Sequence, residues 1–338
     1  MIPVFDIHSH FLINAFLLRK RFERRHGHAF LWNPFRNAYD LPRARAGGVA
    51  GAIFTIYEPG WPALLGGGMK AVRAMRRRYD RMLDQCGGEV VPCTSAAQVR
   101  AAFGAGTFAA PLAVEGMHVI DGDAANVRVL RDTGVRMGTI VHFVSTPLAD
   151  ACWGPRRHGG LSARGREVVR EMQRLGMIVD LAHADRETFW TAIALAQSPY
   201  VVSHSGAKNA GAGSRGLDDE QLHAIRDLGG VAGVIFFPWY LKRHSIIATI
   251  DLVARHIAYI ADTIGVDHVC IGTDADSNIW LPFDFKDVSR FPSLTDALGK
   301  HGFSEPELRK IYSDNFLRVM EQTDPKFHAG QESGPAPE

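Results

Sequence analysis

The sequence predicts an α/β fold, a (β/α)8 TIM barrel, from three observations. The chain has 338 residues and is 46% hydrophobic, enough for one large barrel. Eight short apolar runs rich in β-branched residues recur along it, and amphipathic segments separate most of them. No Gly-x-Gly-x-x-Gly follows the first run, which disfavours the alternative, a doubly wound open sheet.

The eight predicted strands are short and apolar, and their order along the chain alternates with helical patterns. They are Pro3–Ile7, Gly51–Tyr57, Ala110–Val114, Met137–Val141, Met177–Leu181, Tyr200–Ser203, Val231–Phe236 and His268–Gly272. Between them, Gly165–Leu175 places Val168 and Met172 on one helical face. Asp218–Leu228 begins with acidic residues, as helix N-termini prefer. Strands that alternate with helices predict a parallel sheet.

The predicted domain organisation is a single barrel over residues 1–322 with two insertions, at about 11–45 and 60–109. The second insertion is long enough for two helices. Insertions at the mouth of a barrel often wall a substrate pocket. Residues 323–338 are rich in Gly, Pro, Glu and Ser, which predicts a disordered tail.

Charge and hydropathy argue against two classes of partner. The net charge is +2, so no global field favours nucleic acid. No apolar run reaches the roughly 20 residues that span a bilayer, so no membrane association is expected. Basic runs within 19–25 and 73–81 are either solvated helix faces or a docking surface for an acidic partner. We expect a small-molecule substrate, and a homodimer is the default assembly for a soluble oligomer.

The cysteines predict no thiolate site. They are Cys86, Cys93, Cys152 and Cys270, and no Cys-x-x-Cys pair occurs among them. Free thiols suit a reducing compartment. The first predicted strand begins at Pro3, which leaves no room ahead of it for a signal peptide. Together these observations predict a cytoplasmic protein.

Histidines and acids gather at the C-terminal ends of the predicted strands. Asp6-Ile7-His8-Ser9-His10 closes the first strand, and two histidines two residues apart on a strand point to the same side. The full set at strand ends is His8, His10, Glu115, His142, His183, His204 and Asp274. A barrel gathers these ends around one mouth, where its catalytic residues lie.

Taken singly, each of these residues has a structural interpretation. A strand-end histidine is more often a hydrogen-bonded structural residue, Glu115 suits a helix N-terminus, and Asp274 suits a loop cap. Jointly, four to five histidines and two carboxylates match a site for one or two transition metals. The sequence therefore predicts a metallohydrolase.

The arrangement resembles the amidohydrolase superfamily, and more closely the membrane (renal) dipeptidase family, peptidase family M19. The resemblance runs from Val4 to about Glu321. The matching segments are short but occur in order: 45–57, 114–118, 139–142 with 146–150, 179–183, 203–205, 215–219, 271–276 and 314–319.

The resemblance implies a role for each matching residue. His8 and His10 would bind one zinc ion, His183 and His204 the other, and Glu115 would bridge the two. The residues implied to act on the substrate are His142 at the scissile carbonyl oxygen, Arg215 at the substrate carboxylate and Asp274 beside the metal-bound water. Arg215 alone also fits a surface arginine paired with Asp218 or Asp219.

One position departs from the family pattern, which has Asp-x-His-x-Asp at the first strand where this chain has His10. Histidine is the usual second ligand in the wider superfamily. The exchange replaces an anionic ligand with a neutral one and leaves the metal pair more positive by about one charge. That change favours a metal-bound hydroxide and can alter the preferred metal.

The resemblance implies a zinc-dependent dipeptidase that hydrolyses an amide bond with a hydroxide bridging two divalent ions. One alternative is a non-peptidase amidohydrolase, such as a deacylase, a lactonase or a hydrolase of a specialised-metabolite amide. The other is an inactive metal-binding relative. Aromatic segments at 30–32 and 236–240 either hint at a non-polar substrate portion or pack on the barrel.

Overall fold

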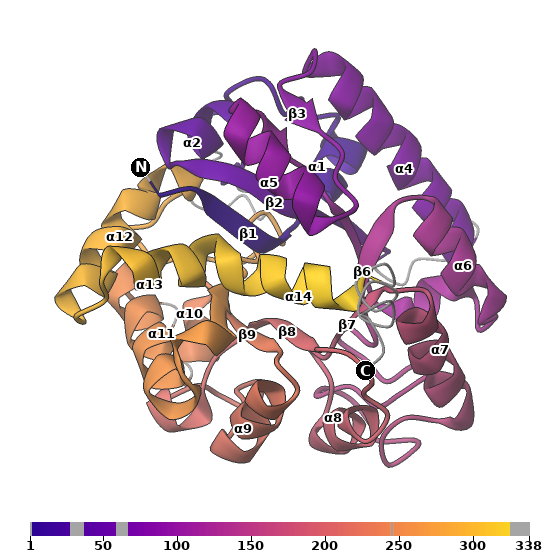
Figure 1. Ribbon diagram of the computed structural model, residues 1–338. Coiled ribbons are helices and arrows are strands. Elements are labelled where there is room, and N and C mark those ends of the chain that lie inside the picture. The colour runs from indigo at the N-terminus through magenta and orange to yellow at the C-terminus, as the bar shows by residue number, and fades with distance from the viewer. Residues whose placement is uncertain (1, 28–36, 59–66, 244, 246, 325–338) are drawn as a thin grey trace, which may run out of the picture.

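The computed structural model describes residues 2–27, 37–58, 67–243, 245 and 247–324, and these form a closed barrel of parallel strands surrounded by helices (Figure 1). Its strands, in order around the ring, are β1 (Val4–Ser9), β2 (Val49–Tyr57), β5 (Leu112–Glu115), β6 (Val135–Thr139), β7 (Ile178–Asp180), β8 (Val201–Ser205), β9 (Val231–Val234) and β10 (Val269–Ile271).

The ring closes between the first and last of these strands. Ser9 forms a parallel bridge with Ala275, just beyond β10. The backbone N–H of His10 donates to the carbonyl of Ala275 at 2.8 Å, and that of Asp274 donates to the carbonyl of His8 at 3.0 Å. Closure thus brings the first and last predicted site segments side by side.

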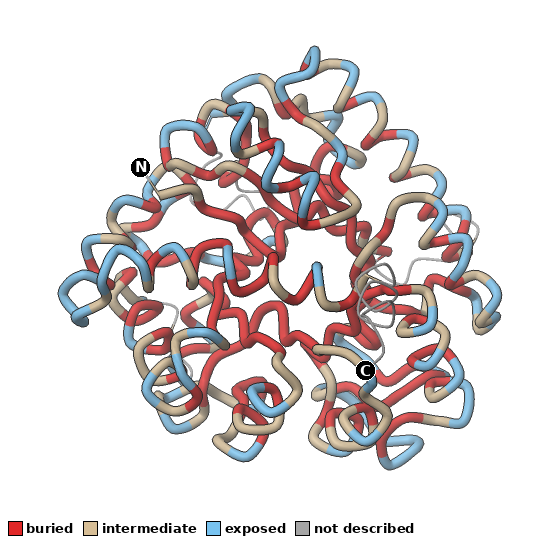
Figure 2. Tube along the Cα trace, viewed as in Figure 1, coloured by how far each residue is buried: buried red, intermediate tan, exposed pale blue. Residues whose placement is uncertain are grey.

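Helices pack around the ring, most of them on its outer side (Figure 1). They are α1 (Phe11–Leu18), α2 (Leu41–Ala46), α4 (Gly68–Gln85), α5 (Ala96–Ala105), α6 (Ala125–Asp132), α7 (Ala163–Arg174), α8 (Arg186–Ile193), α9 (Asp219–Asp227), α10 (Pro238–Leu241), α11 (Ile250–Ile264), α12 (Phe291–Lys300), α13 (Glu305–Arg309) and α14 (Asn315–Thr323). Figure 2 shows the strands buried inside this layer, while solvent reaches the outer faces of the helices.

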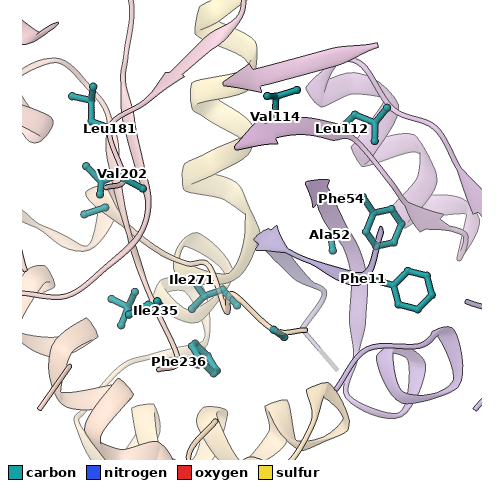
Figure 3. Close-up of a cluster of buried hydrophobic side chains, with 14 of the residues drawn as sticks. Phe11, Ala52, Phe54, Leu112, Val114, Leu181, Val202, Ile235, Phe236 and Ile271 are labelled. Carbon is teal, nitrogen blue, oxygen red and sulfur yellow. The ribbon is translucent and has the colours of Figure 1, made fainter. Parts of the chain in front are cut away.

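Two apolar cores hold the barrel together. The larger one lies between strands and helices and includes Phe54, Val114 and Val202, as Figure 3 shows. The smaller one contains Phe5 and other strand residues together with residues of α14. In Figure 1, α14 lies across this end of the ring, which is the end where the strands begin. The opposite end is left open as the mouth.

The eight predicted strands are confirmed, with shifted ends. β8 runs on to Ser205, so His204 lies within a strand that was predicted to end at Ser203. Glu115 is the last residue of β5, whereas His142 and His183 follow β6 and β7 by three residues each.

The first connection holds α1 and α2, and the second holds α4 and α5, the two helices expected there. Two short strands were not predicted: β3 (Val90–Val91) and β4 (Phe108–Ala109), which extend the sheet beside β2. The predicted tail at 325–338 and the aromatic segment at 30–32 lie outside the described residues. No helix within the described residues is both long enough and apolar enough to cross a membrane.

Candidate active site

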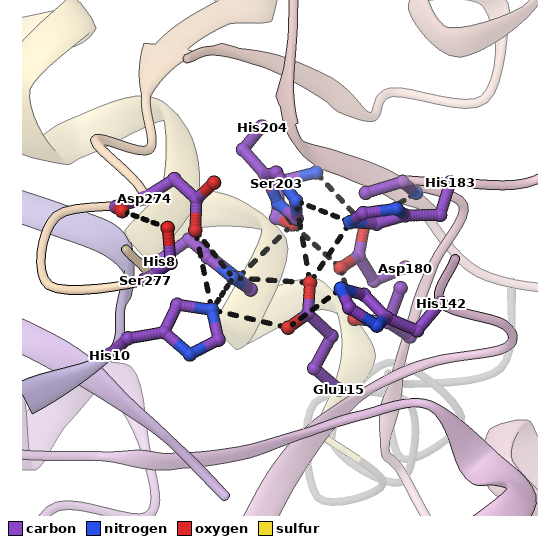
Figure 4. A network of polar contacts seen from close by, with 12 residues as sticks. His8, His10, Glu115, His142, Asp180, His183, Ser203, His204, Asp274 and Ser277 are labelled. Carbon is purple, nitrogen blue, oxygen red and sulfur yellow. Dashed lines mark hydrogen bonds and ion pairs between the residues drawn. The ribbon is translucent and has the colours of Figure 1, made fainter. Parts of the chain in front are cut away.

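The mouth brings all the predicted metal-binding side chains together (Figure 4). Nε2 of His8 lies 3.1 Å from Nε2 of His10. On the other side, Nε2 of His183 lies 2.9 Å from Nε2 of His204. The histidines thus form two pairs joined by the stacked rings of His8 and His204, whose centroids lie 3.9 Å apart. The assignment of one metal ion to each pair stays a prediction.

Glu115 lies between the two histidine pairs. Its Oε1 is 3.5 Å from Nε2 of His8, 3.1 Å from that of His183 and 3.4 Å from that of His204. Its Oε2 is 3.1 Å from Nε2 of His10. Neither oxygen has a hydrogen-bond partner of good geometry among the described residues, although both are buried. A buried, unsatisfied carboxylate surrounded by imidazole nitrogens is suited to bind cations.

His8 and His10 lie close together, but not because both belong to a regular strand whose alternate side chains point to the same side. β1 ends at Ser9, and its pairing with β2 is irregular between Asp6 and Ser9. His10 is the N-cap of α1, with φ −108° and ψ 17°. An irregular strand end and a helix start therefore aim both rings into the mouth, as bulges near active sites often do.

Strained backbone aims two further side chains. His183 has φ +66° and Asp274 has φ +57°, in the left-handed region that residues other than glycine rarely adopt. Such conformations cost about 1–3 kcal/mol each and concentrate at functional sites. Strand periodicity could not predict where these side chains point.

A buried network around Asp180 orients the ring of His204, and sequence reasoning missed it. Ser203 Oγ lies 2.8 Å from His204 Nδ1 and donates to Asp180 Oδ2 at 2.6 Å. Thr139 Oγ1 donates to the same carboxylate oxygen at 2.6 Å. Partners of this kind fix the orientation of a ligating imidazole. The available signal was an aspartate inside the apolar run Ile178–Leu181.

A second missed carboxylate, Asp6, stabilises the joint between the first and last strands. It accepts hydrogen bonds from the backbone N–H of His8 at 3.2 Å and from that of Thr273 at 2.9 Å. Thr273 Oγ1 adds a bond at 2.5 Å. Burial raises the pKa of Asp6 to about 6, against the lowering effect of these bonds. Asp6 thus belongs to the Asp6–His10 motif because it holds the backbone that carries His8 against the segment after the last strand.

Glu115 and Asp274 favour positive charge on the imidazole that lies between them, His10. Burial alone would lower the pKa of His10, but Glu115 and Asp274 raise it to about 10. Burial lowers the pKa of His183 and that of His204 well below the usual value. His183 and His204 are thus neutral, as metal ligation requires, whereas His10 has to release a proton when it binds a metal.

These donors fit a divalent metal centre. Groups of three whose ligand atoms all lie within 4.8 Å of one another are His8–Glu115–His204, His8–His10–Asp274 and Glu115–His142–His183. The unsatisfied oxygens of Glu115 and the convergence of imidazole Nε2 atoms on them match the ligand chemistry of zinc and similar ions.

The two residues predicted to act on the scissile carbonyl and on the attacking water, His142 and Asp274, lie at the edge of this cluster. Oδ1 of Asp274 is 3.3 Å from Nε2 of His10. Nε2 of His142 is 3.7 Å from Oε2 of Glu115. Burial, together with the charges of His10 and Arg215, lowers the pKa of His142 to about 4, so its ring is neutral near pH 7.

Arg215 points into the site rather than joining the surface pair that was its alternative. It is only 8% exposed, and its guanidinium carbon lies 4.7 Å from the ring centre of Tyr240. Asp218, its alternative partner, pairs instead with Arg186 and Lys208. A desolvated guanidinium stacked on an aromatic ring suits carboxylate recognition.

A cavity of about 420 Å³ connects these groups. Its lining residues are His10, Ile13, Asn14, Leu17, Tyr57, His142, Phe143, His183, Arg215, Phe237, Tyr240, Asp274, Asp276, Ser277, Asn278 and Ile279. Of the aromatic segment 236–240, Phe237 and Tyr240 face this cavity and Phe236 packs in the core. The cavity size is typical of small-molecule sites, which span roughly 300–1,000 Å³.

Comparison with known proteins places this chain in a family. The model of the membrane dipeptidase family (peptidase family M19) matches residues 1–333. The chain belongs to that family. The match confirms the resemblance drawn from the sequence, the barrel fold and the class of enzyme, a metallopeptidase-type hydrolase.

Individual relatives agree with this assignment. An uncharacterized dipeptidase of Schizosaccharomyces pombe is 39% identical over 220 residues, which cover 64% of this chain and 54% of that protein. The dipeptidase aclJ of Aspergillus oryzae is 32% identical over 294 residues, 83% of this chain and 69% of that protein. The chain thus spans about half the length of one curated relative and about two thirds of the other.

A solved structure extends the comparison over nearly the whole chain. A metallopeptidase from Rhodobacter sphaeroides, liganded with a phosphinate mimic of the dipeptide L-Ala-D-Ala, superposes with a TM-score of 0.84. It is 28% identical and covers 95% of this chain and 99% of its own.

Proposed function

We propose that this chain is a zinc-dependent dipeptidase that hydrolyses the amide bond of dipeptides. The observation that carries the proposal is the buried Glu115, unsatisfied at both oxygens, between two pairs of histidines. The phosphinate dipeptide mimic bound by the Rhodobacter sphaeroides relative supports the substrate class.

In this proposal His8 and His10 would hold one zinc ion, His183 and His204 would hold the other, and Glu115 would contribute its carboxylate to both. When bound, the two ions activate water for attack and polarise the scissile carbonyl. Ser203 and Asp180 keep the ring of His204 oriented through its Nδ1. These four imidazoles already converge on the carboxylate of Glu115 before any substrate enters, which lowers the reorganisation that catalysis needs.

Three residues act on the substrate. Arg215 binds the substrate's terminal carboxylate through its planar guanidinium, held in place by Tyr240. The neutral ring of His142 donates a hydrogen bond to the carbonyl oxygen as negative charge develops there, a contribution of roughly 3–4 kcal/mol for a well-placed donor. Asp274 accepts a proton from the attacking water and returns it to the leaving amine.

A panel of dipeptides, assayed with metal analysis, tests the proposal. We expect hydrolysis that stops when a chelator removes the metal and returns when zinc is added, and a content close to two zinc ions per chain. A folded protein with no bound metal and no hydrolysis would contradict both parts of the proposal.

A second candidate function, hydrolysis of an N-acyl amino acid, is favoured by the apolar side chains in the cavity, among them Ile13, Leu17 and Ile279. The same catalytic groups would serve it. N-acyl amino acids in the same panel distinguish the two candidates. An inactive relative is disfavoured because every predicted ligand and Asp274 are present and converge.

A further inference from the structure

The cavity at the mouth has two chemically different ends. Arg215 follows β8, and it lies together with Tyr240, which follows β9. In the ring of eight strands, β8 lies opposite β2. α1 follows β1, the neighbour of β2, so Ile13 and Leu17 of this helix line the wall across from Arg215. A substrate that spans the metal ligands from Arg215 therefore reaches α1.

Three apolar side chains line the end of the cavity at α1. Ile13 and Leu17 lie one helical turn apart on α1, and Ile279 joins them from the connection after β10. Of the polar neighbours, Asn14 Nδ2 donates to the carbonyl of Asp276 at 3.1 Å, and Ser277 Oγ donates to that of Asp274 at 2.7 Å. Asp276 Oδ2 has no hydrogen-bond partner among the described residues. A ligand at this end therefore meets the three apolar side chains next to one carboxylate oxygen.

Leu17 is the residue whose exposure needs an explanation. Its side chain is 45% exposed although it lines the cavity. Water contact with apolar surface costs roughly 25 cal/mol per Å², so covering Leu17 with an apolar group is favourable. Phe143, 47% exposed, lines the same cavity from the connection after β6.

Exposed apolar side chains are concentrated around the mouth. Among the described residues, nine of the ten large exposed hydrophobics lie in connections that follow β1, β6, β9 and β10. They are Leu17, Leu18, Phe143, Val144, Trp153, Trp239, Ile247, Trp280 and Phe283, and the exception is Val129 on α6. This distribution indicates that apolar surface is retained where substrate enters.

We propose that Ile13, Leu17 and Ile279 form a subsite that selects a large apolar group on the acyl side of the scissile amide. For a dipeptide this is the side chain of the N-terminal residue, and for an N-acyl amino acid it is the acyl chain. The proposal rests on the proposed function, because Arg215 must hold the carboxylate at the other end. The specificity of this chain would then depend on the acyl-side group of the substrate.

Two neighbouring leucines provide a matched test. Leu17 and Leu18 are adjacent on α1 and are 45% and 43% exposed, but only Leu17 lines the cavity. Both can be replaced by asparagine at similar cost to the fold, since exposed substitutions usually change stability by less than about 0.5 kcal/mol. The substrates share a C-terminal alanine and carry Gly, Leu or Phe at the N-terminal position.

In the unaltered protein we expect kcat/KM for Leu-Ala and Phe-Ala to exceed that for Gly-Ala by about tenfold or more. Leu17→Asn should reduce this ratio about tenfold, mainly through KM, because a loss of about 1.4 kcal/mol in binding is a factor of ten. Leu18→Asn should leave it unchanged. Binding of phosphinate mimics with Gly or Phe side chains, measured by calorimetry, should show the same pattern without turnover.

The outcomes separate the two proposals. Equal kcat/KM for all three dipeptides, or equal effects of Leu17→Asn and Leu18→Asn, would overturn the subsite and leave the dipeptidase proposal intact. If the zinc-loaded protein cleaves none of the dipeptides and no N-acyl amino acid, and binds neither phosphinate, both proposals are wrong.

Discussion

The two ends of the barrel are built from the same strands but carry opposite chemistry. Where the strands begin, Phe5, Ile7 and Met137 pack with Phe316 of α14 in a closed apolar core. Where they end, the side chains are imidazoles and carboxylates that line an open cavity. The closed end supplies stability, and the open end can therefore hold groups that burial alone would disfavour.

β1 shows this contrast within six residues. Phe5 and Ile7 belong to the closed core, whereas Asp6 stabilises the joint with the last strand and His8 faces Glu115. The same chain segment thus serves folding with one set of side chains and chemistry with the other. Substitutions at the two ends should accordingly affect different measurements.

At the closed end, Phe316→Ala should have the largest effect on stability. The side chain is 1% exposed and its ring stacks on Phe5 with centroids 5.8 Å apart. Removing a buried phenylalanine costs about 3–5 kcal/mol, so urea denaturation should show that loss. Phe143→Ala at the mouth is the control, because Phe143 is 47% exposed, and it should change stability by less than about 0.5 kcal/mol.

At the open end, Asp274→Asn should lower kcat by about 10²–10⁴-fold, the usual contribution of a general acid–base group. The fold and the bound metal should be retained, because asparagine has the shape of aspartate and tolerates the left-handed backbone at this position. Steady-state kinetics with metal analysis measures both quantities. A near-normal kcat would show that Asp274 handles no proton in the reaction.

Arg215→Ala should have a smaller and substrate-dependent effect. We expect kcat/KM to fall roughly 30- to 100-fold for dipeptides, as a charged hydrogen bond of about 2–3 kcal/mol predicts. Dipeptide amides, which lack the carboxylate, are the control and should lose little. Equal losses on both substrates would assign Arg215 a structural role.

The smallest effect is expected at a carboxylate that stabilises the mouth without facing the cavity. Asp150 accepts hydrogen bonds from the backbone N–H groups of Arg157 at 2.7 Å, His158 at 2.9 Å and Gly159 at 2.8 Å. Burial would raise the pKa of Asp150, but these bonds lower it below 3.8. Asp150→Asn should therefore destabilise the protein by about 1–2 kcal/mol at pH 7.

The sign of the pH dependence follows from that lowered pKa. The stabilisation is fully present above the unfolded-state pKa of about 3.9 and is lost as the pH falls through the lower folded-state value. The free energies of unfolding of the unaltered protein and of Asp150→Asn, measured by denaturant titration, should thus differ at pH 7. They should converge at a pH below the folded-state pKa of Asp150. A constant difference at all pH values would contradict this account.

The sequence by itself determined the barrel, its eight strands and which chemistry-bearing residues gather at its mouth. Short apolar runs specify buried strands through burial alone, and parallel strands that alternate with helices bring their C-terminal ends together. Seven residues scattered from His8 to Asp274 could therefore be assigned to one mouth without coordinates.

The tertiary structure alone decided how those side chains are aimed. The irregular end of β1, the left-handed backbone at His183 and the network through Asp180 depend on contacts between distant segments, which local periodicity does not encode. Arg215 on Tyr240 and the apolar wall formed by α1 likewise depend on how connections pack after the barrel has closed. Sequence patterns specify which groups reach the mouth, and packing determines the positions in which they act.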